Sequence, residues 1–249
     1  MANLNKSKIF ENFNGIILVN KKRGITSFGV IKKMRWIFFL NKIGHAGTLD
    51  PNAEGLLIVL INKATKLSNH FLSLGKDYIA KFKLGIETET WDTEGKVIRE
   101  ASLQGINEEA LLRAIKSLEG DFNQIPPIFS AKKIKGKPAY AYARKKEKIT
   151  LEAKVVKIYN IDFISFDGEN AVIKINCSSG TYVRSVVNII GKILGCGATL
   201  TSLLRTRIGS YDISESVTLD ELERNAYDEN FFKLFGKGIE SMDGFLGKI

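Results

Sequence analysis

The sequence predicts a mixed α/β (α+β) fold in one main domain. Strand-like and helix-like segments alternate irregularly along the 249 residues, and nothing repeats at a fixed period. The chain is 44% hydrophobic and 26% charged, with 22 Gly and 4 Pro; this composition is typical of a globular protein and excludes a disordered or collagen-like chain. Single domains of this length are common, so we expect one domain over residues 1–249.

The first half of the chain has strand and helix patterns around a turn-rich loop. An apolar run at residues 15–19 predicts a strand that ends in a basic turn. Ser27 is an expected N-cap for a helix to about Leu40, whose apolar residues fall on one stripe. Residues 44–55 have no periodicity and predict a loop, followed by a strand at 56–61. Residues 78–84 alternate between apolar and polar, which indicates a half-buried strand.

The second half continues in the same manner. A helix is expected from its cap at Asn107 to about Leu118, and another over residues 181–194 that stops at Gly195. Strands are expected at 155–166 and 171–177, joined by a hairpin turn, and at 200–208. Thr218 with Glu221 three residues later predicts a capping box at the start of a last helix.

The charge of the chain points to a polyanionic partner. There are 37 Lys and Arg against 27 Asp and Glu, a net charge of +10, which favours nucleic acid first and an anionic membrane surface second. Residues 132–148 contain eight Lys or Arg with Tyr140 and Tyr142 between them, and residues 21–42 contain seven with no acid. Two separate basic clusters, one with aromatics, favour a folded RNA or duplex over a small anion.

Several classes of protein are disfavoured by what the sequence lacks. Two Cys and two His without ligand spacing disfavour a zinc enzyme or a histidine-based hydrolase, and no Walker A loop or Rossmann fingerprint is present. The N-terminus is polar and basic, unlike a signal peptide, and the longest apolar run is too short to span a membrane. We therefore expect a cytoplasmic protein with no metal or cofactor, whose chemistry is carried by carboxylates, Lys, Arg or Tyr.

The loop of residues 42–55 contains the candidate catalytic group. Gly44 and Gly47 permit close backbone approach, His45 supplies a titratable ring, and Asp50 is held extended by the proline that follows it. An acid in a Gly-rich loop of an RNA-binding chain is a candidate for function. The run Gly-His-Ala-Gly-Thr-Leu-Asp-Pro resembles the signature of the bacterial tRNA pseudouridine synthase B (TruB) family.

Other segments carry the same resemblance in order from about residue 15 to 209. They are Lys21-x-x-Gly24-x-Thr26-Ser27, Lys76-Asp77-Tyr78, Thr88 to Gly95, Gln124 to Ala131 with Lys133 and Arg144, Cys177 to Arg184, and Leu203-x-Arg205-Thr206. Lys22, Glu89 and Lys146 depart from the residues usual in the family at their positions. The resemblance implies a pseudouridine synthase fold, with a mixed, largely antiparallel sheet flanked by helices and an RNA-gripping insertion at about 124–151. Residues 210–249 are too few for the family's usual C-terminal RNA-binding domain, which we expect to be absent or vestigial.

The resemblance also implies a reaction and a role for each site residue. The family isomerises the T-loop uridine (uridine 55) of tRNA to pseudouridine without cofactor or metal, using an aspartate nucleophile. Asp50 takes that role here, Arg184 holds it ionised, and Tyr78 stacks on the flipped base and assists proton removal. His45 fills the vacated place in the loop stack, Tyr182 and Leu203 line the base pocket, and RNA contacts are expected from Lys21, Lys133 and Arg144. We expect a monomer that acts on the T-arm stem-loop without an obligate protein partner.

Two alternatives remain open at this point. A T-arm-binding module could aid tRNA folding with little catalysis, although an intact Asp50 favours the enzyme. A glycosidase needs two cooperating carboxylates, and Glu54 is the only acid close to Asp50 in the sequence. The string of motifs and the basic clusters disfavour the glycosidase.

Overall fold

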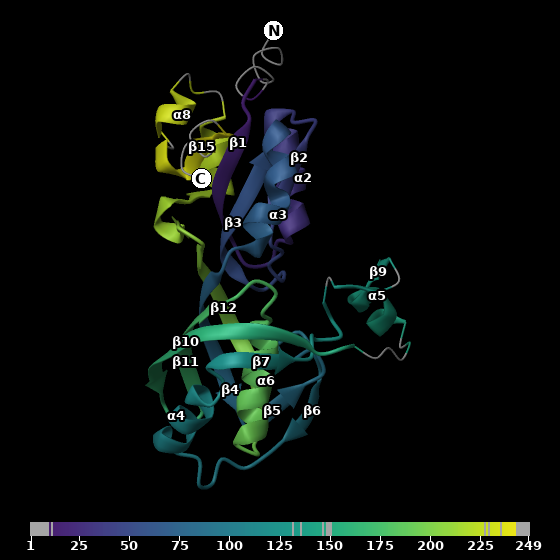
Figure 1. Cartoon of the computed structure of the whole chain (residues 1–249), viewed down its shortest axis with the longest axis vertical. Coiled ribbons are helices and arrows are strands. Elements are labelled where there is room, and N and C mark those ends of the chain that lie inside the picture. Colours follow the sequence, from purple (N-terminus) through teal and green to yellow (C-terminus); the bar gives the residue numbers. More distant parts are fainter. Residues whose placement is uncertain are drawn as a thin grey trace. The chain divides into compact units, whose positions relative to one another are not determined.

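The computed structural model divides into two compact units. It describes residues 10, 12–130, 132–134, 136–145, 147, 151–226, 228, 230–234 and 236–242. The first unit contains residues 1–76 and 204–249, and the second contains residues 77–203 (Figure 1). Among the residues that the structure describes, no helix has the length and apolar character that crossing a bilayer requires.

The first unit is built around strands β1 and β3. Its elements are β1 (Gly15–Lys21), α2 (Ser27–Phe38), β2 (Ile43–Ala46), β3 (Glu54–Ile61), the 3-10 helix η1 (Asn62–Leu67), α3 (Ser68–Ser73), β13 (Tyr211–Asp212), η2 (Ile213–Glu215), β14 (Val217–Thr218), α7 (Leu219–Arg224), α8 (Phe231–Leu234), η3 (Gly236–Gly238) and β15 (Ile239–Ser241). β1 pairs antiparallel with β3 and β15 and parallel with β14. β3 also pairs antiparallel with β2.

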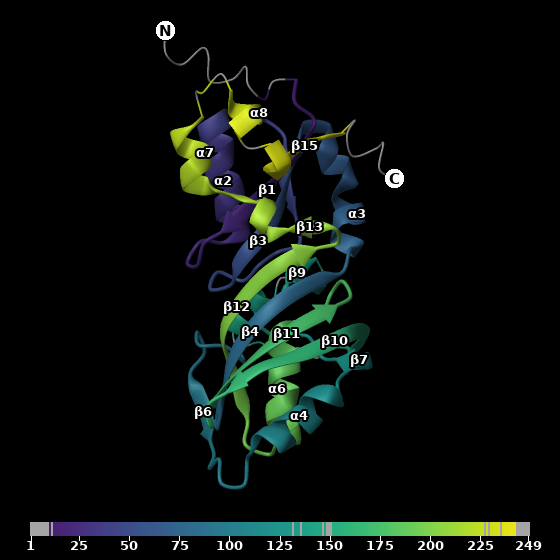
Figure 2. The same ribbon diagram turned by 90° about the vertical axis from the view of Figure 1, so that its left-hand side faces the viewer.

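Both faces of this sheet are covered, which explains why its strands are apolar runs. Ile17 and Val19 of β1 pack with α2, α7 and α8 in one core cluster. Ile16 and Leu18 face the opposite way and pack with Phe71 of α3. Figure 2 shows α2 and α7 on one side of β1 and β3, and α3 on the other. A strand buried on both faces is expected to lose the alternation of a half-exposed strand.

The second unit carries a sheet with the strand order β12-β4-β11-β10-β7. Its elements are β4 (Lys76–Leu84), β5 (Ile86–Thr88), β6 (Val97–Glu100), α4 (Glu108–Lys116), β7 (Gly120–Gln124), β8 (Lys133–Ile134), β9 (Lys137–Pro138), α5 (Ala139–Arg144), β10 (Lys154–Phe166), β11 (Asn170–Cys177), α6 (Val183–Ile193) and β12 (Ala198–Ile208). β10 is antiparallel to β7 and β11. Helices α4 and α6 contact one another (Figures 1 and 2). The chain leaves this unit through β12, whose last residues belong to the first unit.

The predicted fold class is confirmed, with two local corrections. Among the strand pairs of the described residues, most are antiparallel, and parallel pairs are few, as in β1 with β14 and β3 with β12. Ser27 is not the cap of α2, because the Thr26 side chain accepts from the Gly29 N–H. The stretch predicted as a loop also contains β2, which pairs residue by residue with β3. The strand has only 4 residues, too short for a periodic signal, and forms because β3 offers it a partner.

Candidate active site

Asp50 lies in the connection between β2 and β3. It is partly buried, and its carbonyl accepts from the Ala53 N–H at 3.1 Å. The connection is flanked by Gly47 at φ +88° and Gly55 at φ +104°, a region of backbone conformation that favours glycine. A Cβ on Gly55 would lie 2.2 Å from the carbonyl oxygen of Arg205. Close approach of β12 therefore requires glycine at the start of β3.

Side chains outside the connection hold the residues on both sides of Asp50. The buried Ser27 hydroxyl accepts from the Leu49 N–H at 2.9 Å and donates to the Leu49 carbonyl at 3.1 Å. On the other side, the Pro51 carbonyl accepts from Lys21 Nζ at 3.1 Å and from the Gly24 N–H at 2.9 Å. These bonds fix the backbone immediately before and after Asp50, and they restrict where its carboxylate can lie.

Lys21 is a fully buried cation beside this connection. Its Nζ also donates to the carbonyls of Lys22 at 3.1 Å and Ile25 at 2.7 Å. Burial lowers the pKa of Lys21 to about 8, while the charges of Asp50 and Glu54 act to raise it. Lys21 was predicted to contact RNA, yet in the structure its ammonium bonds to the protein's own backbone. At neutral pH it remains charged and favours the ionised form of a neighbouring carboxylate.

Arg205 is a second buried cation, at 1% exposure. Its Nε donates to the Leu56 carbonyl at 2.7 Å and its Nη2 to the Gly47 carbonyl at 2.9 Å. It therefore ties the beginning of the Asp50 connection to the strand that follows. The sequence alone predicts no role for Arg205, and its signal there is its place in the motif that begins at Leu203.

His45 lies on β2 with Val59 of β3 as its register partner. Burial, followed by the charge of Arg205, lowers its pKa below the ordinary histidine value. Its Nδ1 is buried and has no hydrogen-bond partner within the described part of the chain. The ring is therefore neutral at pH 7, and a neutral ring suits the stacking role predicted for it.

The second unit contains the other predicted site residues. Tyr78 is buried on β4 and Leu203 is buried on β12. Tyr182 immediately precedes α6, and its N–H donates to Oε1 of Gln124 at 2.6 Å. The Gln124 Nε2 donates to the Gly180 carbonyl at 2.9 Å. Gln124, which sequence reasoning recognised only as part of a motif, is fully buried and orders the turn that leads into α6.

Arg184 lies in the first turn of α6 and is almost fully buried. Its Nη1 donates to the Thr90 carbonyl at 3.1 Å and lies 3.4 Å from Oδ2 of Asp92, and its Nη2 donates to the Phe129 carbonyl at 2.9 Å. The guanidinium is thus oriented by the segment of residues 88–95 on one side and by the Phe129 carbonyl on the other. Its predicted partner Asp50 belongs to the first unit, so that pairing stays a prediction.

The insertion at about residues 124–151 contains two further predicted site residues, Lys133 and Arg144. The backbone of Lys133 lies in β8 and that of Arg144 in α5, but their side chains lie outside the described part of the structure, as do residues 131, 135, 146 and 148–150. Their predicted RNA contacts stay predictions. Within the described residues, no three His, Cys, Asp or Glu side chains gather as a metal site would require.

Comparison with known sequences gives the class of the protein. A family model described as TruB family pseudouridylate synthase (N terminal domain) matches residues 35–183, so the class of the protein is that of the pseudouridylate synthases. A second model, the tRNA pseudouridylate synthase B C-terminal domain, matches residues 184–246. The chain belongs to the TruB family, as the resemblance predicted. The expectation that residues 210–249 hold at most a vestigial C-terminal domain stays a prediction.

Curated relatives and solved structures agree with this family. The chain is 37% identical over 232 residues to tRNA pseudouridine synthase B of Francisella tularensis subsp. novicida, covering 93% of this chain and 76% of that protein. It is 38% identical over 219 residues to the protein of the same name from Francisella philomiragia, and the match covers 88% of this chain and 72% of that protein.

The fold also matches a Cbf5-Nop10-Gar1 complex with a TM-score of 0.71 and 27% identity, over 95% of this chain and 62% of that chain. A chain of an H/ACA RNP bound to a substrate RNA containing 2'-deoxyuridine matches with a TM-score of 0.67 and 26% identity. The match covers 92% of this chain and 60% of that chain. This chain therefore spans less than two thirds of each of these two solved chains.

Proposed function

We propose that the chain isomerises uridine 55 in the T-loop of tRNA to pseudouridine. The observation that carries the proposal is an aspartate in the family's signature loop, with the backbone held by other side chains on both sides of it. Curated relatives over most of the chain are named tRNA pseudouridine synthase B. The net charge of +10 suits a polyanionic substrate.

The reaction needs a nucleophile and a path for one proton. The bond between N1 of the base and C1′ of the sugar breaks, the base turns, and C5 bonds to C1′ while C5 loses its proton and N1 gains one. No atom is gained overall and no oxidation occurs. We assign the nucleophile to Asp50, acting on either the sugar or the base. The buried cation Lys21 supports the ionised carboxylate from its own unit, and Arg184 is proposed to pair with it.

The uridine must leave its stack to reach such a carboxylate, at a cost of about a few kcal/mol. In this proposal His45, with its neutral ring, fills the vacated place in the loop. Tyr78 stacks on the extruded base and assists removal of the C5 proton, and Tyr182 and Leu203 line the pocket. The remaining proposed RNA contacts are Lys133 and Arg144. The ammonium of Lys21 is fully buried and bonds to backbone carbonyls, so its proposed role is to support the ionised carboxylate.

The proposed substrate is the T-arm stem-loop of tRNA, bound by a monomer in the cytoplasm. An unmodified tRNA transcript incubated with the protein and mapped at nucleotide resolution tests the activity. Pseudouridine at position 55, and none in a transcript with cytidine there, is the expected result. A protein that binds the transcript with no product would overturn the proposal in favour of a tRNA-folding module.

A further inference from the structure

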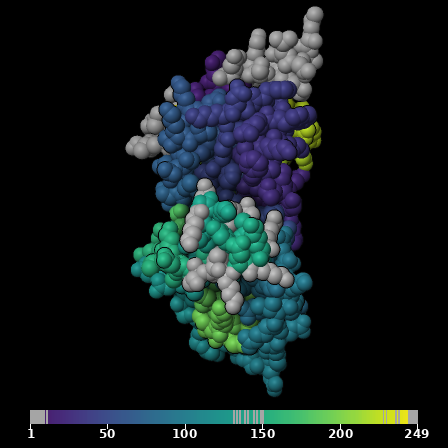
Figure 3. Space-filling view, turned by 90° about the vertical axis from the view of Figure 1, so that its right-hand side faces the viewer, coloured from purple at the N-terminus to yellow at the C-terminus, as the bar shows by residue number. Residues whose placement is uncertain are grey.

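Helix α2 has an exposed face that the site does not use. Four exposed residues of α2 lie on one side of the helix. The first is Phe28, and Lys32, Arg35 and Trp36 follow it by four, seven and eight positions. The two aromatic side chains are 65% and 70% exposed. The opposite side of α2 is buried in the core. In Figure 3 the purple atoms, which belong to the chain around α2, lie at the surface of the first unit.

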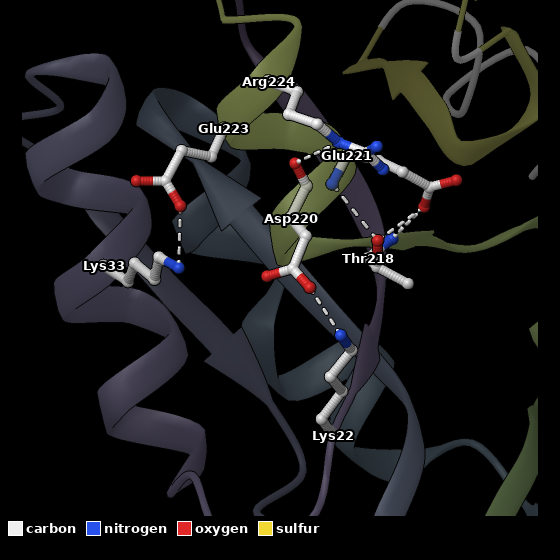
Figure 4. A network of polar contacts seen from close by, with 7 residues as sticks. All are labelled: Lys22, Lys33, Thr218, Asp220, Glu221, Glu223 and Arg224. Carbon is white, nitrogen blue, oxygen red and sulfur yellow. Dashed lines mark hydrogen bonds and ion pairs between the residues drawn. The ribbon is translucent and has the colours of Figure 1, made fainter.

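The charges of this region are neutralised on one side only. Lys22 pairs with Asp220 of α7 at 2.5 Å, and Lys33 of α2 pairs with Glu223 of α7 at 2.8 Å (Figure 4). Lys32 and Arg35 have no acidic partner within the residues that the structure describes. The acids of α7 therefore pair with Lys22 and Lys33, and they leave the positive charge on the aromatic face of α2 uncompensated.

We propose that this α2 face binds RNA beside the target uridine, with bases stacking on Phe28 and Trp36 and phosphates contacting Lys32 and Arg35. Aromatic rings interleaved with cations are the combination that binds bases and backbone together. This inference rests on the proposed function. A partner that is negatively charged and carries stacking rings suits the face better than a purely apolar one.

The extent and position of the face fit a short stretch of nucleic acid. Phe28 and Trp36 are separated by about 12 Å along the helix axis, which is about three to four stacked bases. Ser27, the residue before Phe28, bonds to Leu49 next to Asp50. The face therefore begins at the candidate active-site connection and continues away from it along α2.

Equilibrium binding to an unmodified tRNA transcript tests the proposal with paired variants. Trp36→Gln removes a stacking ring, and the matched control Tyr159→Thr removes a ring exposed on β10. Arg35→Gln removes a cation, and the matched control Arg113→Gln removes an exposed helical arginine from α4. We expect Trp36→Gln to raise Kd by about 5- to 150-fold. Arg35→Gln should lower the magnitude of the salt slope of log K by about 0.7 to 0.9. The controls Tyr159→Thr and Arg113→Gln should change neither the Kd nor the salt slope.

A direct readout comes from tryptophan fluorescence. Stacking predicts quenching of Trp36 by the transcript, and that component should be missing in Trp36→Phe. If Trp36→Gln and Arg35→Gln bind tRNA as the wild type does, the inference is wrong even where pseudouridine is formed. A wild type that self-associates through this face, with unchanged tRNA affinity in the variants, would also overturn it. Failure of the proposed function would instead appear as wild-type protein that forms no pseudouridine.

Discussion

Ser27→Ala tests whether the backbone around Asp50 is held in place from α2. The change removes the acceptor of the Leu49 N–H and the donor to the Leu49 carbonyl, both at buried positions. A buried backbone group left without a partner costs about 1 to 3 kcal/mol. Two such groups predict a fall of about 2 to 6 kcal/mol in the free energy of unfolding. A displacement of about 1 Å in a reacting group can cost about 100-fold in rate, so we expect kcat to fall by about that factor.

Thr26→Ala is the matched control, because Thr26 caps the same helix without bonding to Leu49. Losing a cap costs about 1 kcal/mol, so this variant should be less stable and fully active. Urea unfolding gives the stabilities. Release of tritium from uridine labelled at C5 gives the rates, measured where circular dichroism finds both variants folded. A folded Ser27→Ala with wild-type kcat, or an equal loss of kcat in Thr26→Ala, would show that the bonds from Ser27 to Leu49 do not position Asp50.

Three further changes probe the same connection. Lys21 loses its proton at a pKa of about 8 in the folded protein and 10.5 when unfolded. Between these pH values the unfolded chain binds more protons than the folded one, so the free energy of unfolding of the wild type should rise relative to that of Lys21→Met as pH rises from about 8 to 10.5. Urea unfolding measures both free energies, and a difference between them that does not change with pH would contradict this. The lysine of Arg205→Lys cannot bond to the carbonyls of both Leu56 and Gly47, so its free energy of unfolding should fall by about 1.5 to 3 kcal/mol, measured by urea unfolding. Unchanged stability would contradict the role of Arg205 in joining these two segments. Gly55→Ala should lower the free energy of unfolding by more than about 1 kcal/mol, because its Cβ meets backbone and its φ is positive; a thermal melt equal to the wild type's would contradict it.

Elements with local chemical signals could be predicted from the sequence. Asn107 caps α4, and Thr218 forms the expected capping box with Glu221. The hairpin of β10 and β11 formed at its predicted turn, because the turn residues and the flanking strand patterns agree. These features depend on residues close in the chain, so the sequence records them directly.

The side chains that hold the Asp50 connection could not be predicted in this way. Ser27 had the position of a cap, but Leu49, 22 residues away, offers its hydroxyl both a donor and an acceptor. A fully buried Arg205 has no local pattern, because its acceptors on Gly47 and Leu56 are brought to it by the pairing of β12 with β3. Contacts between distant segments decide both cases. The family motif marks such residues without stating what they do.

Asp50 is the proposed nucleophile for the isomerisation of uridine. The most direct test incubates an unmodified tRNA transcript with wild type, Asp50→Asn and Glu54→Gln, and measures pseudouridine at position 55 together with free uracil. We predict pseudouridine without free uracil for the wild type, product from Glu54→Gln, and none from Asp50→Asn that still binds the transcript. Product from Asp50→Asn would show that Asp50 is not the nucleophile, and free uracil whose release requires both carboxylates would show a glycosidase instead of an isomerase.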